Sequence, residues 1–196
     1  MNQWLPLAAF AFVASITPGP NNVMLSASGA LFGFRRTIPH ILGVSSGFLS
    51  LLASCGAGMG IVLDALPAAD DILRVIGSIY LLYLAWKMRG AFEVSASGSA
   101  ARPLRYYEAF GFQFINPKAW VMSLSAVSVF GSDIEPYWLG VTTICATFLL
   151  VGFPCICSWA ALGASIRPWL HNERRRKYLG LMVAVLATYS VIALWV

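Results

Sequence analysis

Two long apolar segments of this chain are interrupted by residues that cannot continue a helix. The first interruption is the segment 17–22 (TPGPNN), and the second is the segment 116–118 (NPK). A proline inside a helix removes an amide donor and clashes with the preceding turn. In a bilayer the freed backbone groups must face protein or a water-filled cavity. Interrupted helices in corresponding positions of two halves indicate the binding site of a transporter, so we expect a small membrane transporter.

The composition favours a membrane protein over a soluble one. Of the 196 residues, 59% are hydrophobic and 11% are charged, whereas a soluble domain carries about 25% charged residues. The apolar residues fall in long runs, as in membrane spans. We therefore expect one transmembrane transporter domain over residues 1–196 and no soluble module. The net charge is +5. The basic residues lie in short loops, which indicates membrane orientation rather than nucleic-acid binding.

Hydropathy predicts an all-α membrane protein with six spans, approximately at 5–34, 38–63, 72–87, 106–130, 137–166 and 178–196. Eleven of the 13 Lys and Arg residues fall in the first, third and fifth predicted loops. Because Lys and Arg are retained in the cytoplasm, we expect these loops inside a bacterial inner membrane and both termini outside, in the periplasm. This alternation of loop charge requires six spans.

An inverted repeat is the expected internal organisation. A Gly- and Ser-rich linker, about 91–104, joins repeat 1 (about 1–90) to repeat 2 (about 105–196). An offset of 97 residues places Pro20 on Pro117 and Asn21 on Lys118. Since each half has three spans, the second half enters from the opposite side of the membrane. The predicted architecture is two inverted three-helix repeats in which spans 1 and 4 are broken.

The first break has the chemistry of an anion site. Pro18 and Pro20 hold the residues before them in extended conformations, so the first half-helix should end near Ile16. Pro20 suits the first turn of the next half-helix. The amides of Asn21 and Asn22 would then point into the gap, where free amides and the helix dipole attract a carboxylate. A plain proline kink is the alternative, but it does not require the additional polar residues at membrane depth.

The second break places a lysine inside a span. Pro117 again suits the opening of a half-helix, and an intramembrane lysine is a functional candidate. Snorkelling of Lys118 to an interface is the alternative. Tyr106, at the nearest predicted end, is 12 residues away, or about 18 Å along a helix, which exceeds the reach of a lysine. Lys118 would bind a carboxylate or take part in proton coupling, and we expect Gln113 to line the same cavity.

The candidate substrate-binding residues are Thr17, Pro18, Gly19, Pro20, Asn21, Asn22, Gln113, Asn116, Pro117 and Lys118. Gly43 and Gly47 form a G-x-x-x-G pattern, which predicts close helix packing and also permits a homo-oligomer. The sequence contains no Ser/His/Asp arrangement, Walker loop or dinucleotide fingerprint. We therefore expect a secondary transporter rather than an enzyme, with no catalytic residue, cofactor or metal.

Four segments resemble the LysE/RhtB family of amino-acid exporters. They are TPGPNN at 17–22, GFRR at 33–36 followed by Gly43 and Gly47, YLLYLAWK at 80–87, and FQFINPK at 112–118. The resemblance implies export of amino acids or their derivatives across the bacterial inner membrane, driven by the proton gradient. The doubled asparagine and the stretch 43–48 are most similar to the cysteine and O-acetylserine exporter branch.

Two other functions remain as alternatives. A divalent metal-ion exporter of related architecture would need carboxylates at the midplane, whereas the acidic residues here are assigned near loops. A membrane redox protein would use Cys155 and Cys157, but their spacing is not C-x-x-C. The expected partners are therefore a small amino-acid substrate, protons and the lipid bilayer.

Overall fold

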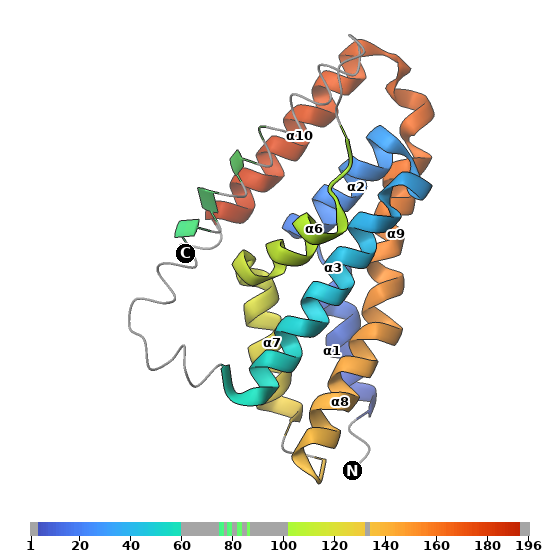
Figure 1. Cartoon of the computed structure of the whole chain (residues 1–196). Helices are drawn as coiled ribbons and strands as arrows, with labels where there is room; N and C mark the ends of the chain where they lie inside the picture. The colour runs from blue at the N-terminus through green and yellow to red at the C-terminus, as the bar shows by residue number, and fades with distance from the viewer. Residues whose placement is uncertain are drawn as a thin grey trace.

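The computed structural model describes residues 4–59, 102–131 and 134–192, with a few isolated positions between 75 and 86. Throughout these residues the regular structure is helical (Figure 1). The predicted third span (72–87), most of the predicted linker and the last residues of the predicted sixth span lie largely outside the described part.

The first predicted span consists of two helices. Helix α1 covers Trp4–Ile16 and α2 covers Pro20–Phe32, and residues 17–19 between them are not helical. The two helices follow one another along the long axis of the bundle (Figure 1). Each has 13 residues, or about 20 Å, which is shorter than the ~30 Å hydrocarbon core. Neither half-helix could cross a bilayer alone.

Helix α3 covers Phe34–Ser54 and continues into the π-helical turn η1 at Cys55–Met59. Gly33 separates α2 from α3 with φ 83°, a left-handed conformation that favours glycine. The sequence placed Arg35 and Arg36 in a loop, but they belong to the first turn of α3. Hydropathy marks only the apolar part of a helix, so a helix that extends past the apolar region is predicted too short.

The second half contains the other broken span. Helix α6 covers Tyr106–Phe112, a 3₁₀ turn η2 covers Gln113–Ile115, and α7 covers Pro117–Phe130. Helix α8 (Tyr137–Thr147) passes through a π-helical turn η3 (Phe148–Gly152) into α9 (Phe153–Ser165). A 3₁₀ turn η4 (Arg167–His171) leads to α10 (Glu173–Ile192). The basic residues 174–177, predicted as loop, lie in the first turns of α10.

Two continuous helical stretches in the described residues are long and apolar enough to cross a membrane. They are Phe34–Gly58 and Tyr137–Trp169, and α1 is a shorter apolar helix. By length and composition, these stretches have the properties of membrane spans.

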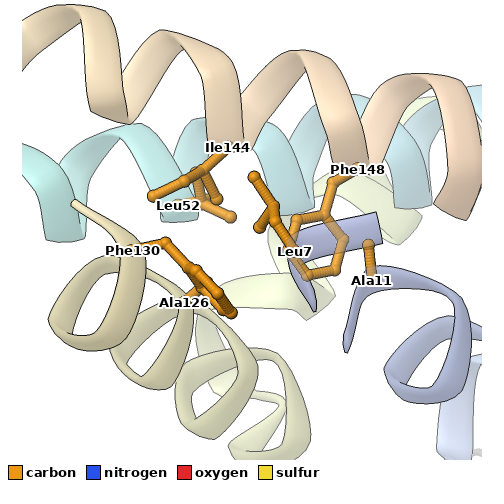
Figure 2. Close-up of a cluster of buried hydrophobic side chains, with 7 residues drawn as sticks. All are labelled: Leu7, Ala11, Leu52, Ala126, Phe130, Ile144 and Phe148. Carbon is orange, nitrogen blue, oxygen red and sulfur yellow. The ribbon is translucent and has the colours of Figure 1, made fainter. Parts of the chain in front are cut away.

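A buried apolar cluster joins the two halves of the chain. Figure 2 shows its side chains meeting from α1, α3, α7, α8 and η3. The cluster consists of Leu7, Ala11, Leu52, Ala126, Phe130, Ile144 and Phe148. It packs α1 against helices more than 100 residues later in the sequence and so holds the first break close to the second half.

Glycines allow two helix pairs to approach at backbone distance. A Cβ atom on Gly163 of α9 would overlap the Ser26 carbonyl of α2, and one on Gly29 of α2 would overlap the Ala160 carbonyl of α9. On α3, a Cβ on Gly43 would overlap the Tyr106 carbonyl of α6, and one on Gly47 would lie 2.6 Å from the Phe110 oxygen. Neither pair has room for a side chain at these positions.

Substitution of Gly163 by alanine should destabilise the protein, because the new methyl group would have to separate α9 from α2. We expect a loss of at least ~1–3 kcal/mol in the free energy of unfolding, measured by thermal denaturation in detergent. The control is Gly111→Ala on α6, where a Cβ would meet nothing within 4 Å. Equal stability of the two variants would contradict the described contact between α2 and α9.

Candidate functional site

The carboxyl end of α1 is the structural centre of the first break. The last carbonyls of a helix have no partner within the helix, and here the carbonyls of residues 15–18, the α1 carbonyl end, are bound by side chains from other elements. Asn22 Nδ2 of α2 donates to Ser15 O and Thr17 O, both at 2.8 Å. Trp159 Nε1 of α9 donates to Ile16 O at 3.2 Å. Three separate helices thus contribute to this end, since Lys118 of α7 supplies the remaining donors.

The Lys118 ammonium group binds only uncharged oxygen atoms in the described residues. Its Nζ donates to Thr17 O at 3.0 Å, to Thr17 Oγ1 at 2.9 Å and to Pro18 O at 3.4 Å. No carboxylate of the described residues forms a salt bridge with it. A lysine has three N–H donors, and all three have partners at the end of α1, where the helix dipole is negative.

Gly19 makes room for the lysine side chain. A Cβ atom on Gly19 would lie 2.8 Å from Lys118 Cδ and 3.1 Å from Nζ. Gly19 itself is buried and extended, with φ −172° and ψ 173°. The backbone angles of Gly19 therefore suit any residue. The position favours glycine because a side chain there would overlap Lys118.

A pair of amide side chains joins the two breaks directly. Asn21 Nδ2 donates to Gln113 Oε1 at 2.8 Å, and Gln113 Nε2 donates to Asn21 Oδ1 at 3.2 Å. Gln113 Nε2 also donates to Ala109 O at 3.0 Å, and the side chain is fully buried. The pairing connects residues 92 positions apart in the sequence.

The two half-helices that follow the breaks begin differently. Pro20 and Pro117 lie in the first turns of α2 and α7, where a missing amide costs no hydrogen bond. Asn116 caps α7 by accepting a hydrogen bond from Lys118 N at 3.2 Å. In the described residues, no side chain caps α2. The start of α2 therefore has the greater capacity to bind an anion.

A small cavity of about 60 Å³ lies between the two breaks. Its polar lining comes from Ser15, Asn21, Asn22, Ser45, Asn116 and Lys118. Its apolar lining includes Phe48, Met122, Phe148, Phe153 and Ile156. One water molecule needs about 10–15 Å³ on this measure, so the cavity accommodates a solute of only a few heavy atoms.

Five of the ten sequence-predicted residues line this cavity: Gly19, Asn21, Asn22, Asn116 and Lys118. The other five do not belong to its described lining. Thr17 and Pro18 instead accept hydrogen bonds from Lys118, Pro20 and Pro117 begin helices, and Gln113 lies behind Asn21 as its hydrogen-bond partner.

Two tryptophans at the breaks were not singled out from the sequence. Trp159 Nε1 donates to Ile16 O at the first break, and Trp120 Nε1 donates to Phe114 O at the second, at 2.9 Å. A buried indole N–H requires an acceptor. These two residues lie away from the predicted span ends, where an indole N–H cannot reach water. Their position in the sequence therefore indicated that free backbone carbonyls lie nearby.

His40 is a second feature that hydropathy did not reveal. Its side chain is 1% exposed, and neither ring nitrogen has a hydrogen-bond partner among the described residues. The described part of the chain contains no group of three or more His, Cys, Asp or Glu residues that could hold a metal ion.

Comparison with known proteins identifies the family. The model of the LysE type translocator family matches residues 12–194. This chain belongs to the LysE type translocator family. It is a family of membrane transporters rather than of enzymes. The chain is 29% identical over 191 residues to a cysteine/O-acetylserine efflux protein of Salmonella typhimurium (strain LT2), covering 95% of this chain and 94% of the relative.

A protein of the same description from Escherichia coli (strain K12) is 28% identical over 190 residues, again covering 95% of this chain and 94% of the relative. No solved structure matches the chain. The family and these relatives agree with the resemblance to LysE/RhtB exporters that the sequence motifs indicated.

Substitution of Asn22 by leucine should be destabilising, because it replaces the amide by an apolar group of similar size and removes the hydrogen bonds that Asn22 donates to Ser15 O and Thr17 O. Ser15 O would lose its side-chain donor, whereas Thr17 O would keep the hydrogen bond from Lys118 Nζ. A buried group without its hydrogen-bond partner costs about 1–3 kcal/mol, and we expect a total loss of this order in thermal denaturation. His40→Leu is the comparison, since it removes a buried polar group without described partners, and we expect no loss. A more stable Asn22→Leu variant would contradict the role of Asn22.

Proposed function

We propose that this LysE-family translocator exports small amino acids or their derivatives, of the cysteine and O-acetylserine kind, out of the cytoplasm and is driven by the proton gradient. The observation that carries this proposal is the small cavity between the two helix breaks. Its polar lining combines an ammonium group with amide and hydroxyl groups, which suits a zwitterion. The description of the relatives as cysteine/O-acetylserine efflux proteins supports the substrate class.

Each end of an amino acid has suitable partners in this site. The first-turn amides of α2 and the Lys118 ammonium would bind the carboxylate, because both carry positive charge toward the cavity. The oxygen atoms of Thr17 would accept hydrogen bonds from the amino group, and the side-chain oxygens of Asn21, Asn22 and Asn116 would accept them from a polar side chain of the substrate. The aromatic wall of Phe48, Phe148 and Phe153 would enclose the rest of the substrate.

For the architecture we propose six spans in two inverted repeats, with the site at their interface. In such a repeat, span 1 corresponds to span 4 and span 2 to span 5, so a contact of span 1 with span 5 implies a contact of span 4 with span 2. At the level of whole spans the described helices are consistent with this rule: α2 of span 1 packs on α9 of span 5 through Gly29 and Gly163, and α6 of span 4 packs on α3 of span 2 through Gly43 and Gly47. The half-helices in contact are not equivalent, because α2 is the second half of span 1 and α6 is the first half of span 4. Rocking of one repeat against the other would give alternating access.

For the orientation we propose that the end of the bundle at the start of α3 faces the cytoplasm of a bacterial inner membrane. The exposed Arg35 and Arg36 belong to the first turn of α3, and the exposed Arg167 of η4 lies beside Gly33, immediately before α3. The start of α10 lies at the same end of the bundle (Figure 1). Lys and Arg are concentrated on the cytoplasmic side of membrane proteins. Both termini would then be periplasmic.

Radiolabelled export from cells tests this proposal, with cysteine, O-acetylserine, threonine and leucine as the panel. We expect wild type to export one group of these compounds, and Lys118→Ala and Asn21→Ala to reduce that export about tenfold or more, because each removes a charged or polar contact worth at least ~1.4 kcal/mol. The control is Gly111→Ala, at equal amounts of protein in the membrane. Export of none of the panel by wild type, or unchanged export by both site variants, would contradict the proposal.

A further inference from the structure

The Lys118 ammonium group occupies a position that is complementary to an ammonium group in general. Thr17 O, Thr17 Oγ1 and Pro18 O lie 3.0, 2.9 and 3.4 Å from Nζ and accept its three N–H donors. The negative end of the α1 dipole adds attraction for a cation. No carboxylate of the described residues neutralises Lys118 there, so three uncharged oxygen atoms and the helix dipole hold the ammonium group without an acidic partner.

The position adjoins the cavity. Gly19 and Lys118 belong to the cavity lining, and the lysine stem passes directly over Gly19. An amino acid in the cavity would carry a primary ammonium group of the same geometry as Nζ. The three oxygen atoms can bind only one ammonium group at a time, so substrate and lysine would compete for them.

We propose that the Lys118 ammonium is a tethered stand-in for the amino group of the transported amino acid. It fills the amino-group subsite formed by Thr17 and Pro18 when the transporter is empty. On substrate binding, the substrate's ammonium takes over these three oxygen atoms, and Lys118 moves to pair with the substrate's carboxylate. This inference rests on the proposed function and assigns a subsite within it.

The exchange is physically favourable only for a zwitterion. It preserves the hydrogen bonds to Thr17 and Pro18. Without an ammonium group, Pro18 O and Thr17 Oγ1 would lose their donor, whereas Thr17 O would keep the hydrogen bond from Asn22. The displaced lysine needs a new anionic partner, and the carboxylate of the substrate supplies it. An amine without a carboxylate would leave Lys118 charged and unpaired. We therefore expect that simple amines do not displace Lys118 from the three oxygen atoms. The flexible four-carbon stem of lysine permits this movement.

Removal of the lysine side chain should open the subsite to a free amine. In purified Lys118→Ala, we expect methylammonium to fill the position of Nζ and to raise the thermal-denaturation midpoint saturably, by about 2–4 °C. Tetramethylammonium at equal concentration is the control, because it has the charge but no N–H donor. Wild type should show no such difference between the two cations, since its own lysine fills the subsite.

Two further variants make the test independent of any folding defect in Lys118→Ala. Lys118→Met keeps most of the stem but not the ammonium group, and it should also respond to methylammonium. Addition of Thr17→Val to the alanine variant removes the Oγ1 acceptor and should weaken the response severalfold. An equal effect of methylammonium on wild type and on both Lys118 variants, or no effect on any of them, would overturn the proposal.

The outcomes separate this inference from the proposed function. If wild type exports an amino acid but methylammonium does not stabilise the Lys118 variants, the proposed role of Lys118 alone is contradicted. If methylammonium stabilises the Lys118 variants but wild type exports no amino acid, the proposed substrate class is contradicted. The assignment of the subsite to a transported amino group is then contradicted as well.

Discussion

The structure depends on satisfying the backbone carbonyls at the end of α1. The last carbonyls of a helix have no partner within the helix, and where they are buried away from water they need donors from other elements. Here Asn22, Trp159 and Lys118 donate to these carbonyls from α2, α9 and α7. Because the donors come from both halves of the chain, the break is stable only when the halves are assembled. The same contacts that satisfy the break therefore fix the tertiary arrangement around it.

This constraint also explains why the site is small and polar. The donors that reach the α1 carbonyl end leave a cavity of about 60 Å³ beside them, and the Asn21–Gln113 pair fixes the second break against the first. Close backbone packing at Gly163 and Gly43 brings the surrounding helices together. A solute that replaces one of the donors would alter contacts between the halves, which provides a direct connection between binding and the rocking motion proposed for transport.

The local features of the fold could be predicted from the sequence, whereas the contacts between distant residues could not. Proline stereochemistry located the end of α1 at Ile16 and the starts of α2 and α7, and the motifs indicated the family. That Lys118 would bind Thr17, 101 positions earlier, depends on the relative rotation of α1 and α7, which local sequence does not determine. Trp120 and Trp159 could have been recognised, since an indole N–H in the middle of a span needs an acceptor. Hydropathy placed Arg35 and Arg36 outside the helix because it records apolar character and not backbone hydrogen bonding.

The most direct test of the account is whether the two breaks meet in the membrane. Asn21→Cys and Gln113→Cys would be combined in a chain whose Cys55, Cys145, Cys155 and Cys157 are replaced, and treated in membranes with a short bis-maleimide. We expect cross-linking as efficient as that of a reference pair, Ser46→Cys with Tyr106→Cys, whose native side chains are hydrogen-bonded at 2.8 Å. We also expect a transported amino acid to protect the 21/113 pair. Cross-linking of the reference pair without cross-linking of 21/113 would contradict the account.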